Sequence, residues 1–178
     1  TLGGYSLSHI LSALLTLLVC LLAVRLLLKL VKKLLESVNQ LIAVVKEPEI
    51  QQALIEVQQG LQKVLDKFNQ TGMRDIDSLI EIVAELRTIT DKLTSALQTL
   101  QQRLNVQEGT EGSTATDLAD ELQVQESLNV IYNTLQETIA AMDNVPKLMG
   151  EFSKAMGSFS QQQLMAYMKF TEAREMLN

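Results

Sequence analysis

The sequence predicts an all-α protein in which an N-terminal transmembrane helix continues into a long helical coiled-coil hairpin or bundle. Leu, Ile, Val, Ala, Gln, Glu and Lys dominate its 178 residues, and only two prolines and eight glycines interrupt them. These residue types favour helices over strands. Apolar residues also recur at alternating spacings of three and four over most of the chain, which is typical of helices that pack along a seam. Because aromatic residues make up only 4% and Trp is absent, a core centred on aromatic side chains is not expected.

An uncharged apolar run near the N-terminus predicts a membrane anchor. The stretch from Leu7 to Val24 contains no Asp, Glu, Lys or Arg, and a bilayer core requires about 20 mostly apolar helical residues. Four cations follow it directly: Arg25, Lys29, Lys32 and Lys33. Cations on this side alone predict a retained single-pass anchor, rather than a cleaved signal sequence, with its basic C-terminal side in the cytoplasm. On a helix these four side chains fall within an arc of about 100°, so we expect them to contact membrane lipids at the bilayer surface.

The remaining chain divides at prolines and at one Gly- and Ser-rich segment. The predicted segments are a transmembrane anchor (1–25), a basic juxtamembrane helix and its continuation with a break at Pro48 (26–72), a coiled-coil helix (73–104), a flexible loop (105–116), and an acidic and then Met-, Gly- and Phe-rich helix pair broken near Pro146 (117–178). A 12-residue loop between two long helices favours folding back into an antiparallel hairpin. A parallel oligomeric rod is the alternative.

The seam spacing predicts which side chains form the core. These positions are Leu27, Val31, Leu34, Val38, Leu41 and Val45; Ile50, Leu54, Val57, Leu61, Val64 and Phe68; Ile76, Leu79, Val83, Leu86, Thr90, Leu93, Leu97, Leu100 and Leu104; and Val124, Leu128, Ile131, Leu135, Thr138, Met142, Val145, Met149, Phe152, Met156 and Phe159.

The residue inventory argues against catalysis and against nucleic acid binding. His9 is the only histidine and Cys20 the only cysteine, so His-based triads, zinc motifs and disulfides are not expected. We therefore expect no enzyme activity, no cofactor, no metal and no small-molecule substrate. The net charge is −6, and Leu104 to Pro146 contains no Lys or Arg, whereas nucleic acid binding requires clustered cations.

A seven-residue repeat is the most specific pattern in the C-terminal part. Residues 147–153 and 154–160 align Lys with Lys, Phe with Phe and Gly150 with Gly157. Since a glycine costs a helix interior about 1 kcal/mol relative to Ala, two at one register predict close approach of another helix. The residues expected to mediate helix association are Met149, Gly150, Phe152, Met156, Gly157 and Phe159.

Two functions follow from these features. The first is a non-enzymatic, single-span, membrane-anchored coiled-coil scaffold or assembly subunit, which pairs with copies of itself or with another helical protein. The alternative is a membrane-active protein, pore-forming or membrane-remodelling, whose N-terminal hydrophobic helix inserts conditionally.

Overall fold

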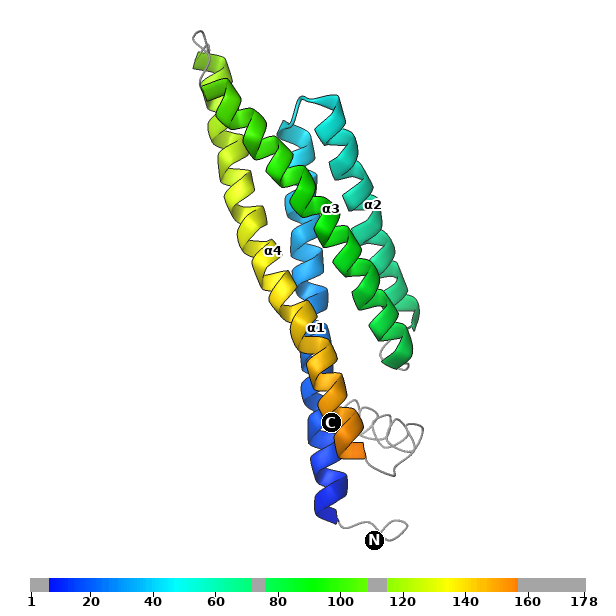
Figure 1. Cartoon of the computed structure of the whole chain (residues 1–178). Coiled ribbons are helices and arrows are strands. Elements are labelled where there is room, and N and C mark those ends of the chain that lie inside the picture. Colours follow the sequence, from blue (N-terminus) through cyan, green and yellow to red (C-terminus); the bar gives the residue numbers. More distant parts are fainter. Residues whose placement is uncertain (1–6, 72–75, 109–114, 157–178) are drawn as a thin grey trace, which may run out of the picture. The chain divides into compact units, whose positions relative to one another are not determined.

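Four helices make up the described part of the chain. The computed structural model describes residues 7–71, 76–108 and 115–156, and within these ranges only residues 45–47 are not helical. The helices are α1 (Leu7–Val44), α2 (Pro48–Thr71), α3 (Ile76–Glu108) and α4 (Ala115–Met156) (Figure 1). The predicted all-α class is therefore confirmed.

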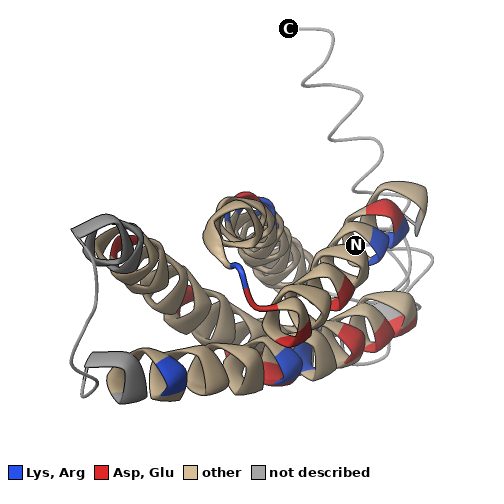
Figure 2. Ribbon diagram, turned by 90° about the horizontal axis from the view of Figure 1, so that it is seen from above, with Lys and Arg blue, Asp and Glu red and all other residues tan. Residues whose placement is uncertain are grey.

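The chain forms two compact units, and α1 and α4 each contribute to both. We call residues 27–142 the four-helix unit. The other unit joins residues 7–26 of α1 to residues 143–156 of α4 among the described residues, and we call it the helix pair. Basic residues (Lys and Arg) and acidic residues (Asp and Glu) both occur along the helices (Figure 2).

The first break between helices coincides with Pro48, which is the first residue of α2. A proline suits this position because its fixed φ is already helical and its missing N–H would have no partner in the helix. The amide of Gln51 donates to the carbonyl of Glu47 at 2.9 Å, which starts the hydrogen-bond ladder of α2. The Gln51 side chain donates to the Ile42 carbonyl at 3.4 Å, near the end of α1, where helix carbonyls lack partners.

Within the four-helix unit, α2 folds back along α1 instead of extending it. The side chain of Gln58 donates to Asn39 Oδ1, so residues that lie further along α2 meet residues that lie earlier in α1. The α2–α3 pair is antiparallel in the same way, since Lys67 forms an ion pair with Glu85. These antiparallel hairpins differ from the parallel rod that the sequence left open.

The core of the four-helix unit lies along the predicted seams. All the predicted positions between residues 27 and 142 whose side chains are described are buried. Each fully buried leucine of this kind stabilises the fold by about 1.5–3 kcal/mol. The buried hydroxyls of Ser37, Thr90, Thr134 and Thr138 donate to carbonyls three or four residues earlier in their own helices. Their burial therefore leaves no unpaired donor.

The fourth helix continues through Pro146, where the sequence predicts a break. α4 extends from Ala115 to Met156 with this proline inside it. A proline removes one helix hydrogen bond, but Pro146 is exposed, and Val145, Met149 and Phe152 beside it are buried in seam register. Burial of this stripe on both sides of the proline favours one continuous helix. The predicted loop is also shorter, because α3 extends to Glu108 and α4 begins at Ala115.

Candidate membrane-contact site

The N-terminal half of α1 buries one face in the helix pair. Its buried residues share one side of the helix and are Ile10, Ala13, Leu17, Cys20, Leu21 and Val24. Residues 143–156 of α4 run beside it in the opposite direction (Figure 1), and they bury Val145, Met149 and Phe152. The two segments belong to one compact unit, and Glu151 of α4 lies close enough to Cys20 of α1 to interact with it electrostatically.

The opposite face of the same half is apolar and exposed. We call it the leucine face, and its members are Leu7, Leu11, Leu15, Leu18, Val19, Leu22 and Leu26, which are 40% to 69% exposed. At 100° per residue they share one side of the helix. Only four other large hydrophobic side chains are exposed in the part of the chain that the structure describes. An exposed apolar stripe of this length marks a contact surface for a membrane or another protein.

The predicted membrane-surface cations extend this face. Arg25, Lys29, Lys32 and Lys33 are all exposed, and their angular positions on α1 coincide with those of the leucine face. α1 therefore has one outward face, on which leucines predominate up to Leu26 and cations from Lys29 onward, with Arg25 at the boundary. Salt bridges between described residues involve other side chains, such as Lys67 and Arg103.

Length and composition qualify α1 as a membrane-spanning helix. Its most apolar 18-residue window is only 33% buried within the chain, whereas a core helix of a soluble protein is mostly buried. The finding is weak evidence by itself, since a signal sequence meets the same length and composition criteria. The orientation predicted from the cations remains a prediction.

Of the predicted helix-association residues, the structure describes the side chains or surroundings of Met149, Gly150 and Phe152. Met149 and Phe152 are buried in the helix pair. Gly150 is exposed, and a Cβ added to it would meet no atom within 4 Å. Close approach of a helix at this glycine therefore does not occur within the described chain and stays a prediction for a partner. The structure does not describe the side chain of Met156. Gly157 and Phe159 also lie outside the described residues.

The close approach occurs at Gly60, which sequence reasoning missed. A Cβ at this position in α2 would lie 3.0 Å from Cδ1 and Cγ1 of Ile89 in α3. The signal was available, because Gly60 is a glycine inside a strongly periodic helix next to the seam residue Leu61. A glycine in a helix interior costs about 1 kcal/mol relative to Ala, so its presence there is a signal that another segment packs closely against it.

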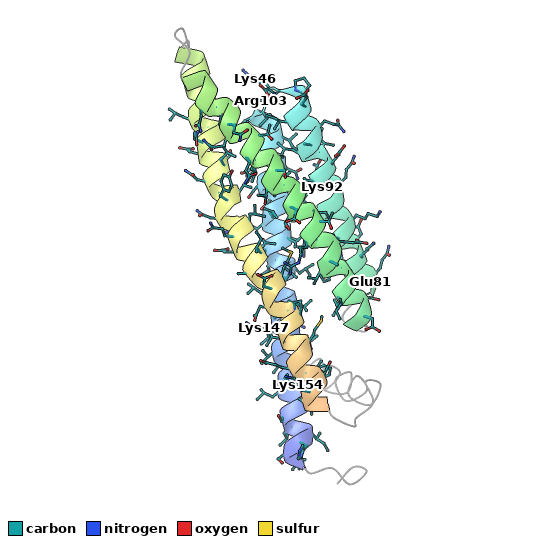
Figure 3. The ribbon with its side chains drawn as sticks, viewed as in Figure 1. Lys46, Glu81, Lys92, Arg103, Lys147 and Lys154 are labelled. Carbon is teal, nitrogen blue, oxygen red and sulfur yellow. The ribbon has the colours of Figure 1, made fainter. Side chains whose placement is uncertain are left out.

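Other polar clusters of the four-helix unit have structural roles. Arg103 of α3 pairs with Glu47 and, at 2.9 Å, with Glu49 at the start of α2. Its hydrogen bonds to Glu49 and then Glu47 raise the pKa of the guanidinium. Figure 3 labels Arg103 close to the α1–α2 connection. The arrangement ties the beginning of α2 to α3.

Two surface grooves of the four-helix unit have mixed polar linings. One of about 440 Å³ lies between α2 and α3, and one of about 350 Å³ lies between α1 and α2. Their lining residues are Ala53, Glu56, Asp91, Lys92, Ser95, Ala96 and Thr99, and Leu35, Asn39, Gln58, Gln59, Gln62, Lys63 and Asp66. Over the described ranges, no three His, Cys, Asp or Glu side chains gather in a way that could hold a metal ion.

Comparison with known proteins gives no relative from which a function could be transferred. No family model matches the chain, and neither a curated protein nor a solved structure matches it.

Proposed function

We propose that this protein is a non-enzymatic, membrane-attached helical scaffold. The N-terminal half of α1 attaches it to a membrane, and its helices associate with copies of itself or with another helical protein. The observation that carries the proposal is the leucine face, where seven large apolar side chains, six of them from the uncharged stretch Leu7 to Val24, point away from the chain's own core. Proteins rarely leave such a stripe in water without a contact surface to cover it.

The size of this face fits membrane attachment only in combination with the cations. If each partly exposed side chain contributes about 1 kcal/mol on burial, the leucine face contributes on the order of 7 kcal/mol. This resembles one myristoyl chain, which alone attaches a protein only marginally. Each cation near an anionic surface adds about 1 kcal/mol. Since Arg25, Lys29, Lys32 and Lys33 follow the leucine face directly, the two features together supply the two signals that stable attachment requires.

Membrane attachment is tested by flotation of the full chain with vesicles. Leu15 and Leu18 of the leucine face are changed to Glu in one double variant, and the matched control changes the exposed Ile80 and Val130 of the four-helix unit to Glu. We expect the first variant to lose at least about tenfold in vesicle affinity, because two carboxylates would have to enter the apolar region. The control should bind as the native chain does. Equal binding of all three would reject the proposal.

The association role is tested separately through the repeat glycines. Gly150→Leu adds a side chain where the chain itself leaves open space, so the fold should persist. If a partner helix packs there, combining it with Gly157→Leu should lower the assembly mass measured by light scattering. An unchanged mass would remove this surface from the scaffold model.

A second candidate function is conditional insertion by a pore-forming or membrane-remodelling protein. One observation favours it: α4 covers the inner face of the same apolar run through Val145, Met149 and Phe152. A covered helix could be released for insertion. Release of an encapsulated dye from vesicles would support this candidate, whereas binding without dye release supports the scaffold.

A further inference from the structure

The helix pair places charged residues beside the apolar run. Residues 143–156 of α4 include Asp143, Lys147, Glu151 and Lys154, and all four are exposed. Figure 3 labels Lys147 and Lys154 on this part of α4. The apolar run of α1 is therefore accompanied along its inner face by a helix whose outer surface is charged.

This arrangement is incompatible with α1 crossing a bilayer while it keeps its neighbour. In a span centred on residues 7–24, Cys20 would lie about 7 Å from the bilayer mid-plane, well inside a hydrocarbon half-thickness of about 15 Å. Residues 143–156 form one compact unit with this run, and Glu151, beside the buried Phe152, interacts electrostatically with Cys20, so Glu151 would enter the hydrocarbon with it. Charged groups at that depth are strongly unfavourable. A span would have to carry this charge or separate α1 from α4.

Lying along the membrane surface removes the conflict. The leucine face and the buried face occupy opposite sides of α1, and α4 covers the buried one. With the leucine face toward the acyl chains, the outer surface of α4 faces water. A helix with one apolar side and one polar side binds in this interfacial position, and here the α4 segment supplies the polar side.

We infer that, in this fold, residues 7–26 of α1 lie within one leaflet of an anionic bilayer, with residues 143–156 of α4 on the water side. The inference depends on the membrane attachment proposed above and adds its geometry and lipid type. The cations decide the lipid type: Arg25 and Lys29 follow the leucine face directly and are exposed, and their long side chains can extend from the edge of an in-plane helix back up to headgroup phosphates. A second copy packed in parallel on this face would instead place Arg25 beside Arg25 of the copy, which is a repulsive contact.

The depth of the leucine face distinguishes the two geometries. Because the chain contains no Trp, Leu7→Trp, Leu15→Trp and Leu22→Trp each introduce a single fluorescent probe at an exposed position. Each full-length variant is bound to phosphatidylcholine vesicles with and without phosphatidylserine, and quenching by lipids brominated at several depths is measured. In a single leaflet, the three probes lie at similar shallow depths. In a span, the middle probe lies about 12 Å deeper than Leu7→Trp.

Two further probes test the water side and the controls. Lys147→Trp on α4 should stay accessible to aqueous iodide when the chain is bound, as should Ile80→Trp on the four-helix unit. Circular dichroism confirms that each variant keeps its helices. Protection of Lys147→Trp from iodide, or a depth profile with its maximum at residue 15, would overturn the inference while leaving membrane attachment intact.

The remaining outcomes separate the inference from the proposed function. Failure of every variant and of the native chain to bind vesicles would overturn both. Binding that is equal with and without phosphatidylserine would overturn the anionic part. Burial of all three leucine-face probes without lipid, together with a doubled mass, would show that a second copy covers the face and would overturn the leaflet geometry.

Discussion

The two halves of α1 share an inner face and differ in their outer one. From Ile10 to Val45 the buried residues follow each other at steps of one, three or four residues and keep to one side of the helix. Residues 7–26 combine this seam with an exposed leucine face, whereas residues 27–44 combine it with exposed Lys29, Lys32, Lys33 and Glu36. The inner seam therefore determines which helix packs against α1. The outer face determines whether the other side meets water or an apolar environment.

The largest expected effect on the free energy of unfolding comes from replacing a leucine by alanine, once on the inner face and once on the outer face of α1. Leu34 is fully buried in the four-helix unit, and Leu15 is 63% exposed on the leucine face. Leu34→Ala should lower the free energy of unfolding by about 2–5 kcal/mol, because it leaves a cavity. Leu15→Ala should change it by less than about 0.5 kcal/mol. Urea denaturation without lipid measures both, and similar losses would mean that the leucine face is covered in solution.

Substitutions at two glycines compare the packing of the four-helix unit with that of the helix pair. Gly60→Leu in the four-helix unit must displace Ile89 from 3.0 Å, and we expect this overpacking to lower the free energy of unfolding by about 1–3 kcal/mol. Gly150→Ala in the helix pair meets open space, so it should raise stability by up to about 1 kcal/mol through helix propensity. Thermal denaturation followed by circular dichroism checks both signs. A loss at Gly150→Ala would indicate an unrecognised contact there.

Most of the core was predictable because the seam spacing is unbroken. The predicted seam residues from Leu27 to Met142 whose side chains the structure describes are buried as expected, since period 3.5 leaves few alternatives for helix packing. The same rule extends the α1 seam back through Leu17 and Ala13. The buried side of residues 7–24 could nevertheless not be predicted in this way, because a helix that is apolar on all sides shows no difference in polarity between its buried and its exposed side.

The remaining differences between the predictions from the sequence and the structure involve contacts between segments distant in the sequence. A proline signals a local break, but the burial of Met149 and Phe152 in α4 outweighs one lost hydrogen bond at Pro146. Likewise, Gly60 and Gly150 are indistinguishable as helix glycines. Only the position of Ile89 in α3 shows which of them a second helix approaches.

Replacing cations tests the outer face of α1 beyond its leucines. Lys29→Gln combined with Lys32→Gln should weaken binding to anionic vesicles by about 2 kcal/mol, or roughly 30-fold, and should leave the unfolding free energy nearly unchanged because both residues are exposed. The control replaces the exposed Lys63 and Lys92 of α2 and α3 by Gln. Flotation at increasing salt provides the measurement, since the difference from the native chain should disappear as salt screens the charges. Equal weakening by the control would mean that total charge, rather than this face, determines binding.

The smallest effect concerns a polar tie that belongs to the four-helix unit alone. Arg103 pairs with Glu47 and Glu49 near the protein surface, and exposed ion pairs contribute about 0–1 kcal/mol. Arg103→Gln should therefore lower the unfolding free energy by less than about 1 kcal/mol, and high salt should reduce the difference. Vesicle binding should not change, because the leucine face and its cations remain intact. A loss of vesicle binding in this variant would mean that the two halves of α1 are coupled, so that the order of the α1–α2 connection affects residues 7–26.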